Sequence, residues 1–176
     1  MTEDRPFAWR TLITAQIVTS LVAISMFVDL PTRLVWNASA SVPIGLYAVR
    51  PIRGLERSAL VLVEPPAPLA IYLARRGYVG VGVPLLKRIE ALPGQTVCRA
   101  GVRVSIDGFP VAEARERDRL GRPLPRWTGC RTLRAGEVFL LNRDQPASMD
   151  GRYFGPLPTA SVIGEAHPMW IPEARR

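Results

Sequence analysis

An uncharged run near the N-terminus constrains the fold of this chain more than any other feature. It extends for 18 residues, from Thr11 to Val28, and reads TLITAQIVTSLVAISMFV. As a helix it would be about 27 Å long, close to the thickness of the hydrocarbon core of a bilayer. Two other interpretations are a buried core helix and a cleaved signal peptide. Ala38-Ser39-Ala40 resembles a cleavage site, but it lies far from the run.

We favour an uncleaved membrane anchor. Arg5 and Arg10 precede the run, and a basic flank of this kind favours a cytoplasmic N-terminus and an exported remainder. The predicted organisation is a cytoplasmic N-terminus at residues 1–10, a transmembrane anchor at 11–29 and one exported domain at 30–176.

The net charge of +8 raises the question of an anionic partner. A basic chain can bind nucleic acid, but the arginines here are scattered and no zinc-finger or helix-turn-helix pattern accompanies them. A basic face toward anionic lipid headgroups accounts for the charge as well. We therefore expect the lipid bilayer, and no nucleic acid, as a partner.

Short β-type runs follow the N-terminal segment. They are rich in Val, Leu and Ile, and Gly or Pro interrupts them roughly every 8–12 residues, which predicts a mainly β, irregular domain. The runs cover residues 58–64, 81–92, 95–106 and 136–142. We predict a short helix at 66–77 that ends at Gly77, and a charged, solvated excursion at 109–125.

Cys98 and Cys130 are the only two cysteines. In an exported domain such a pair suggests one disulfide, whereas in the cytosol it would suggest two buried thiols. Closing the loop between them would stabilise the fold by roughly 3–4 kcal/mol in the chain-entropy model. With the single histidine, His167, which we expect at the surface, they make a poor ligand set. No metal or other cofactor is therefore expected.

Lys87 is the only lysine in a chain with 23 Lys and Arg residues. A codon bias toward arginine could have left it by chance. In an extended strand, however, alternate side chains share a face. Lys87 then falls on the same apolar face as Val81 and Val83, while its charged neighbours, Arg88 and Glu90, fall on the wet face. Burial would lower the pKa of the amine and make it a base, unless the side chain reaches solvent.

A serine-rich segment follows the predicted anchor closely. It reads NASASVPIGLY at residues 37–47 and places hydroxyl groups at alternate positions, Ser39 and Ser41. On its own such a segment is more often a linker than an active site. Its position nonetheless suits a substrate that also emerges from the bilayer.

Three segments together resemble, in order and spacing, the conserved boxes of the membrane-bound serine/lysine signal peptidases. They are NASASVPIGLY, LLKRIEALPGQTV at residues 85–97 and SMDGRYFGPLP at 148–158. The Ser-x-Pro-x-Gly-Leu-Tyr signature is more narrowly similar to the conjugative transfer branch, TraF. The resemblance implies an irregular signal-peptidase-like β fold with a short helix, preceded by one N-terminal transmembrane helix.

The resemblance also implies a role for the matched residues of the first two boxes. Ser41 would be the nucleophile and Lys87 its general base, a serine–lysine variant of the catalytic triad. The hydroxyl of Ser39 would help the backbone N–H of Ser41 to stabilise the oxyanion.

The third box would support the lysine. By resemblance, Ser148 would orient the amine, and Asp150 and Arg152 would form a structural ion pair beneath it. Three positions depart from the family pattern: Gln95 in the second box stands where aspartate is more usual, Met149 stands where an aromatic residue is common in the TraF branch, and Gly151 stands where housekeeping enzymes carry serine.

Taken together, the resemblance implies a protease of the bacterial inner membrane, with one membrane pass and a periplasmic catalytic domain. It would cleave leader peptides from exported precursors, and a pilin-like precursor in conjugative transfer is the expected substrate. The alternatives are a general type I signal peptidase and a non-catalytic, membrane-anchored assembly factor of a conjugation system.

Overall fold

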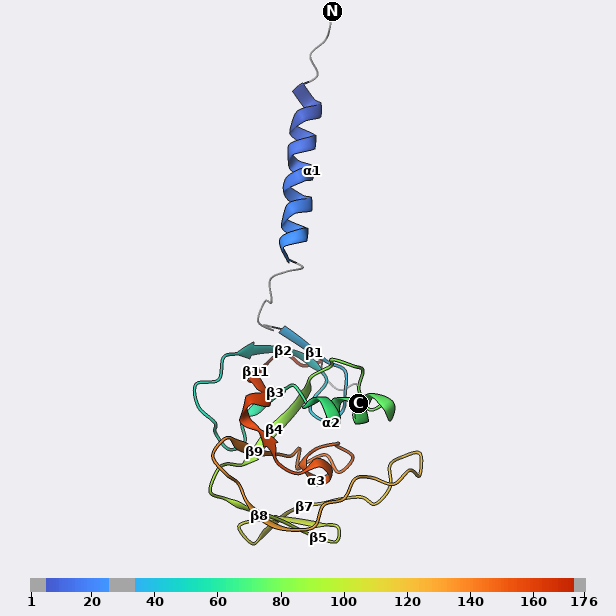
Figure 1. Cartoon of the computed structure of the whole chain (residues 1–176), viewed down its shortest axis with the longest axis vertical. Helices are drawn as coiled ribbons and strands as arrows, with labels where there is room; N and C mark the ends of the chain where they lie inside the picture. Colours follow the sequence, from blue (N-terminus) through green and yellow to red (C-terminus); the bar gives the residue numbers. More distant parts are fainter. Residues whose placement is uncertain (1–5, 26–33, 173–176) are drawn as a thin grey trace, which may run out of the picture. The chain divides into compact units, whose positions relative to one another are not determined.

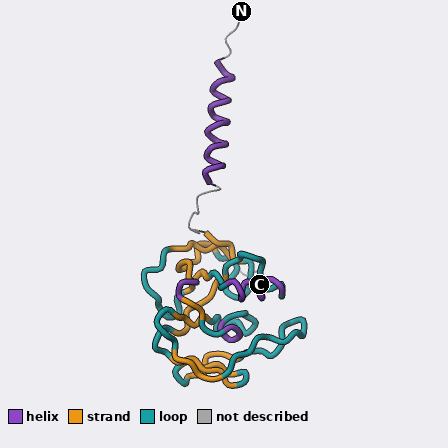
Figure 2. Tube along the Cα trace, viewed as in Figure 1, coloured by secondary structure: helices purple, strands orange, loops and turns teal. Residues whose placement is uncertain are grey.

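The computed structural model describes residues 6–25 and 34–172, and the chain divides into two compact units (Figure 1). The first unit contains one helix. The second contains two β-sheets and short helices joined by many loops (Figure 2).

The first unit consists of α1 (Pro6–Ser25). Within this unit the side chains described along the helix are exposed, apart from one that is half-buried. Among the described helices, none combines the length and the apolar character needed to cross a membrane. The structure therefore does not support the transmembrane helix predicted at 11–29, whose last four residues, 26–29, lie outside the described residues.

The second unit is mainly β, as predicted, and every strand pairing described in its two sheets is antiparallel. A seven-stranded sheet has the order β1-β2-β11-β3-β4-β9-β10 and consists of β1 (Leu34–Asn37), β2 (Gly45–Arg50), β3 (Leu60–Val63), β4 (Leu85–Ala91), β9 (Glu137–Leu140), β10 (Leu157–Pro158) and β11 (Val162–Trp170). A four-stranded sheet has the order β7-β6-β5-β8 and consists of β5 (Thr96–Ala100), β6 (Arg103–Ile106), β7 (Phe109–Glu113) and β8 (Gly129–Thr132). It lies at the end of the unit opposite to β1 (Figure 1).

Three short helical segments complete the unit: α2 (Ala67–Arg75), α3 (Gly151–Phe154) and a 3-10 turn at Thr159–Ser161. The helix predicted at 66–77 is confirmed as α2. It starts after Pro66 and is followed by Gly77. The φ of Gly77 is 69°, a left-handed conformation that glycine adopts easily and that ends the helix.

β4 is the central structural element of the site, and it differs from the predicted strand in two ways. It begins at Leu85, so Val81 and Val83 precede it in an exposed turn instead of sharing the apolar face of Lys87. It also pairs with β3 on one side and β9 on the other, and six of its seven side chains are buried because both faces are covered. Glu90 is therefore buried, contrary to the expected wet face.

The run predicted at 95–106 is two strands. Gly101, with a φ of 63°, allows the tight turn that folds β6 back onto β5. The excursion predicted at 109–125 begins as β7, and its outer part is tied down because Asp118 accepts hydrogen bonds from Tyr78 Oη (2.8 Å) and Arg122 Nε (2.7 Å).

The two sheets share a core. Phe139 of β9 and Leu141, which follows this strand, pack in one buried cluster with Val97 of β5 and Val104 of β6. This cluster fixes the four-stranded sheet to the strands that carry the candidate site.

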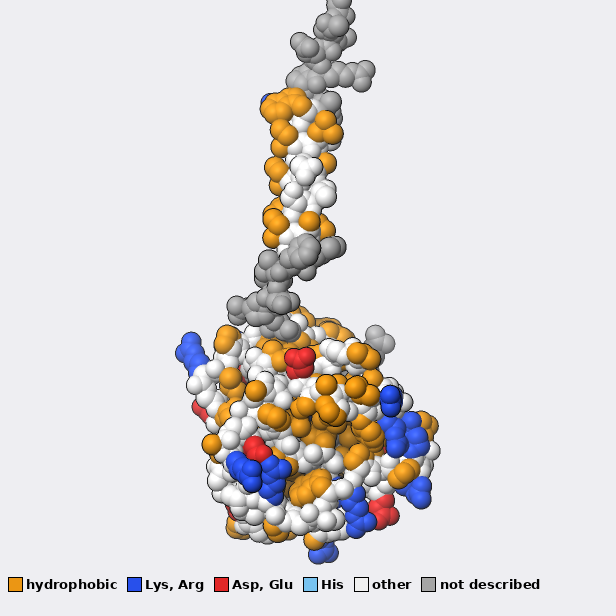
Figure 3. Space-filling model, in the orientation of Figure 1, with side chains coloured by type: hydrophobic (Ala, Val, Ile, Leu, Met, Phe, Trp, Pro, Cys, Tyr) orange, Lys and Arg blue, Asp and Glu red, His pale blue; other side chains and the backbone are white. Residues whose placement is uncertain are grey.

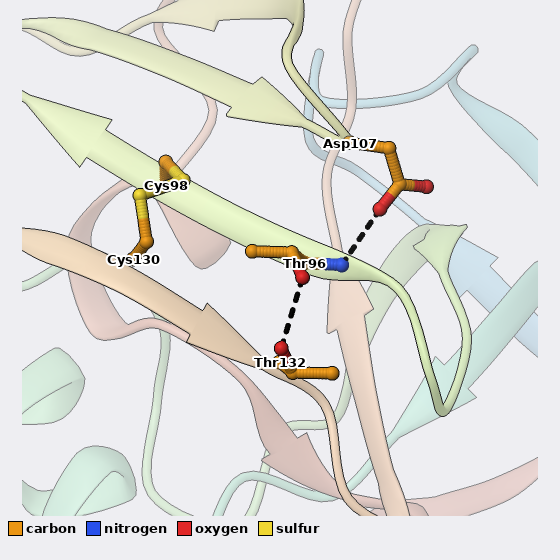
Figure 4. The surroundings of a disulfide bond; sticks show 5 residues. All are labelled: Thr96, Cys98, Asp107, Cys130 and Thr132. Atoms are coloured by element: carbon orange, nitrogen blue, oxygen red, sulfur yellow. Dashed lines mark hydrogen bonds between the residues drawn. A yellow bond between two sulfur atoms is a disulfide. The ribbon is translucent and has the colours of Figure 1, made fainter.

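Cys98 of β5 and Cys130 of β8 lie opposite each other and form a disulfide (Figure 4). Beside it, Thr96 and Thr132 join their hydroxyl groups at 2.9 Å, and the Thr96 N–H donates to Asp107 Oδ1 at 2.7 Å. The disulfide therefore connects β8, which follows the long excursion, to the hairpin of β5 and β6.

Candidate active site

The segment between β1 and β2 holds Ser41 in a compact loop. The loop is held together by Asn37, which is 7% exposed and forms hydrogen bonds through both its amide nitrogen and its amide oxygen. Asn37 Nδ2 donates to the carbonyl groups of Ser39 (2.8 Å), Val42 (3.0 Å) and Pro43 (3.0 Å). Its Oδ1 accepts from the N–H (3.0 Å) and the hydroxyl (2.9 Å) of Ser39. The loop is thus fixed without belonging to either strand.

Ser41 is half-buried, and its Oγ lies 2.9 Å from the Oγ of Ser39. Because the Ser39 hydroxyl proton is directed to Asn37, the Ser41 hydroxyl is the donor of this pair. The structure therefore brings together the two serines that the first box predicts.

Lys87 is 3% exposed and lies in the middle of β4. Its Nζ donates to Ser148 Oγ at 2.9 Å, as expected for a serine that orients the amine. Burial is the main cause that lowers the pKa of Lys87, and the resulting pKa is about 8. The negative charge of Asp150 raises this pKa, and the positive charge of Arg152 lowers it further. A large fraction of the amine is therefore unprotonated, and able to accept a proton, at mildly alkaline pH.

Asp150 and Arg152 form a fully buried ion pair behind the lysine. Arg152 Nε donates to Asp150 Oδ1 and Arg152 Nη2 to Asp150 Oδ2, each at 2.9 Å. Arg152 Nη2 also donates to the carbonyl groups of Asn142 (2.7 Å) and Gln145 (2.9 Å). Both ions are therefore well satisfied, as a buried pair requires.

Asn142 is the residue of this site that sequence reasoning missed. It is the second residue after β9, is 4% exposed, and donates from Nδ2 to the carbonyl groups of Ser41 (2.9 Å) and Leu86 (3.2 Å). Among the described residues, no hydrogen bond joins Ser41 Oγ directly to Lys87 Nζ, and Asn142 is the connection between their backbones. A buried polar residue directly after an apolar strand, in LLNRD, is the signal that could have found it.

The remaining polar residues and the two cysteines have structural or surface positions. Glu90 Oε2 accepts from Arg143 Nη2 at 2.6 Å, which compensates its burial. His167, on β11, has a side chain that is 40% exposed, so its predicted surface position is confirmed. The Cys98–Cys130 disulfide belongs to the four-stranded sheet.

Gly151 departs from the pattern expected of housekeeping enzymes for a steric reason. A Cβ atom at this position would lie 2.7 Å from both the Leu140 carbonyl oxygen and the Phe139 ring. Real Cβ atoms do not approach backbone oxygen so closely, so only glycine fits above this phenylalanine.

Gly151→Ala is therefore expected to reduce the free energy of unfolding by about 1–3 kcal/mol, the usual range for overpacking. Urea denaturation measures the change. Gly54→Ala is the matched control, because a Cβ at Gly54 meets nothing within 4 Å, and it should leave the midpoint nearly unchanged. Equal effects of the two variants would contradict the steric explanation.

The pKa of Lys87 can be measured directly by NMR. Because Lys87 is the only lysine, a protein labelled with carbon-13 lysine gives lysine signals from this residue alone. We expect the Cε shift of the folded protein to titrate with a midpoint near 8, against an ordinary value of 10.5. A midpoint above 10 would show that the amine is solvated.

The same pKa predicts how stability depends on pH. Between about 8 and 10.5 the unfolded chain binds this proton and the folded chain does not, so the free energy of unfolding rises with pH in this window. Relative to Lys87→Met, which has no titrating group there, the rise is expected to be about 3 kcal/mol.

Residues 7–171 match the family described as signal peptidase, peptidase S26, and the match includes the whole site described above. The chain belongs to the S26 family of signal peptidases.

Within this family the chain is similar to TraF proteins. It is 35% identical to the plasmid transfer protein TraF of Escherichia coli over 139 residues, which cover 72% of this chain and 76% of that protein. It is 36% identical to the conjugal transfer protein TraF of Agrobacterium fabrum over 144 residues, with coverages of 76% and 80%. The predicted resemblance to the TraF branch is confirmed.

One solved structure is also similar. It is a signal peptidase I from Enterococcus faecalis, with a TM-score of 0.40 and 24% sequence identity, and the alignment covers 65% of this chain and 97% of that chain.

Proposed function

We propose that this signal peptidase homologue is a serine endopeptidase in which Ser41 is the nucleophile and Lys87 the general base. The observation that carries the proposal is the burial of the only lysine, which lowers the pKa of its amine to about 8 and places it on Ser148. A buried lysine amine with a lowered pKa and a fixed hydrogen-bond partner is well suited to act as a general base.

In the proposed reaction, Ser41 Oγ attacks the carbonyl carbon of the scissile peptide bond while its proton passes to Lys87 Nζ. The N–H of Ser41 stabilises the oxyanion, together with the hydroxyl of Ser39 once its proton turns from Asn37 Oδ1 toward the substrate. The lysine ammonium then gives the proton to the leaving amine as the C–N bond breaks. Water, deprotonated by Lys87, hydrolyses the acyl ester, and the proton returns from Lys87 to Ser41.

The substrate class in this proposal is an exported precursor, cleaved between its leader peptide and its mature part. The TraF relatives carry names that refer to plasmid or conjugal transfer, which favours a pilin-like precursor of a transfer apparatus over many general precursors. A panel of precursors separates these two possibilities, because a specialised enzyme cleaves the transfer precursor alone.

The test is cleavage of such a precursor by the purified full-length protein, with the new N-terminus read by mass spectrometry. Wild-type protein should produce one product, and Ser41→Ala none. We also expect kcat/KM to rise about tenfold per pH unit below about 8 as Lys87 loses its proton. A wild-type protein that leaves every precursor intact would favour the assembly-factor alternative.

We further propose that the chain is attached to the inner membrane through its N-terminal segment, with the second unit in the periplasm. Apolar side chains are exposed along α1 and gather on one face of the second unit between basic clusters (Figure 3). Trp36 and Trp170, each more than half exposed, stack at 5.7 Å on β1 and β11. Exposed indole rings of this kind suit a membrane interface.

A reporter that is active only in the periplasm, fused after Arg176, tests the orientation. It should be active, and the protein should leave the membrane fraction with detergent but not with high salt. A stable but inactive fusion would reverse the proposed topology.

A further inference from the structure

Asn142 connects the loop that holds Ser41 to the strand that holds Lys87. Its Oδ1 accepts from the N–H of Arg88 at 3.1 Å, and its Nδ2 donates to the carbonyl groups of Leu86 and Ser41. Leu86 and Arg88 flank Lys87 in β4. One side chain therefore holds the backbone on both sides of the lysine and the backbone of the serine.

The position of Asn142 explains why a side chain performs this task. The backbone pairing of β9 with β4 continues to Leu141, whose N–H donates to the Arg88 carbonyl group at 2.9 Å. The chain then leaves the sheet, and the Asn142 amide takes over by bonding Arg88 N–H and Leu86 C=O. Its second N–H is free to reach outward to Ser41 across a separation of 101 residues in sequence.

Asparagine suits this position because the site needs one acceptor and two donors in a small buried group. The Asn142 side chain fills all three roles. Aspartate would keep the acceptor for Arg88 but lose both donors, and the carbonyl groups of Leu86 and Ser41 would face a carboxylate. Removing donors from buried acceptors is costly, so the two backbones would move apart.

The backbone of Asn142 extends the connection to the ion pair. Its N–H donates to Asp150 Oδ2 at 3.1 Å, and its carbonyl group accepts from Arg152 Nη2 at 2.7 Å. Asp150 and Arg152 are the charged groups that act on the Lys87 amine. A single residue therefore contacts the serine loop, the lysine strand and the charges behind the lysine.

We propose that Asn142 is a positioning residue that sets the approach of Ser41 to Lys87. This inference rests on the proposed function of those two residues. Asn142 contacts only backbone and the ion pair, so it acts through Ser41 and Lys87. A misplacement of about 1 Å between reacting groups can lower a rate about 100-fold.

The test compares Asn142→Asp, which preserves shape, with Asn142→Ala and the control Val104→Ala. Val104 is fully buried in the four-stranded sheet and makes none of the hydrogen bonds of the site, so its truncation destabilises the fold while every polar contact of the site keeps both partners. Cleavage kinetics are measured on full-length protein. The Lys87 Cε titration is measured in the same variants with Ser41→Ala added, so this readout needs no activity.

We expect both Asn142 variants to lower kcat about 100-fold with little change in KM, and Val104→Ala to leave kcat within about twofold. Asn142→Asp should also raise the titration midpoint of Lys87 by about 1, because it adds a negative charge near the amine. Val104→Ala should leave the midpoint unchanged.

An unchanged kcat and an unchanged Lys87 titration in folded Asn142→Asp would overturn the inference. Should the Asn142 variants not fold, slow deuterium exchange of the Asn142 side-chain amide in the unmodified protein supports the three hydrogen bonds, and fast exchange contradicts them. An inactive wild-type protein would refute the proposed peptidase, while the titration would still decide whether Asn142 controls the surroundings of Lys87.

Discussion

Lys87→Arg is expected to abolish precursor cleavage, lowering kcat by about 10⁴-fold or more. Arginine keeps the positive charge, but its guanidinium group does not lose a proton at any pH that the protein survives. Ser41 would then have no base. The larger head group would also have to fit into a site where lysine is only 3% exposed.

Lys87→Met separates these two causes, because methionine fills a similar volume without charge or base. Both variants should be inactive, and Lys87→Met should remain folded. Arg53→Lys, an exchange at an exposed arginine, is the control and should retain full activity. Cleavage by Lys87→Arg at even a tenth of the normal rate would exclude Lys87 as the general base.

Asp150→Ala is expected to reduce the free energy of unfolding by about 3–5 kcal/mol, the usual cost of removing one partner from a buried ion pair. Asp150 and Arg152 are 0% and 1% exposed, so the remaining guanidinium group would be a buried charge without a counter-ion. The Asn142 N–H would also lose its acceptor.

Chemical denaturation of the purified variants measures this loss, with Asp144→Ala as the control because Asp144 lies exposed in the same loop. Asp150→Ala combined with Arg152→Met should be less destabilised than the two single changes added together, because it removes both charges. A loss below about 1 kcal/mol for Asp150→Ala would mean that Arg152 is sufficiently satisfied by carbonyl groups alone.

The sequence predicts those parts of the structure that depend on local pattern. Runs of β-branched and apolar residues identify β3 and β9, and Pro66 with Gly77 delimits α2 to within two residues. Lys87 and Ser148 are matched as a pair through their boxes, and the structure places them in hydrogen-bond contact. The disulfide follows from there being two cysteines in a domain assumed to be exported.

The remaining features depend on contacts between distant segments, which a single sequence does not reveal. Alternation in β4 predicts a wet face for Glu90, but side chains on both faces of β4 are buried, and Arg143, from the segment after β9, pairs with the Glu90 carboxylate. The need for glycine at 151 depends on Phe139, and the role of Asn142 depends on Ser41, more than 100 residues away. Neither partner is recognisable from its own neighbourhood in the chain.

The burial of Lys87 has a consequence for the evolution of chains like this one. With a pKa lowered to about 8, the buried amine destabilises the folded protein at neutral pH by about 3 kcal/mol, and an apolar residue there would remove that burden. In a lineage that no longer needs peptide cleavage, selection for stability would favour the replacement of this lysine by an apolar residue. If Lys87 is the proposed base, a lysine retained at this position marks relatives in which selection still acts on peptide cleavage, and its loss marks relatives expected to be inactive.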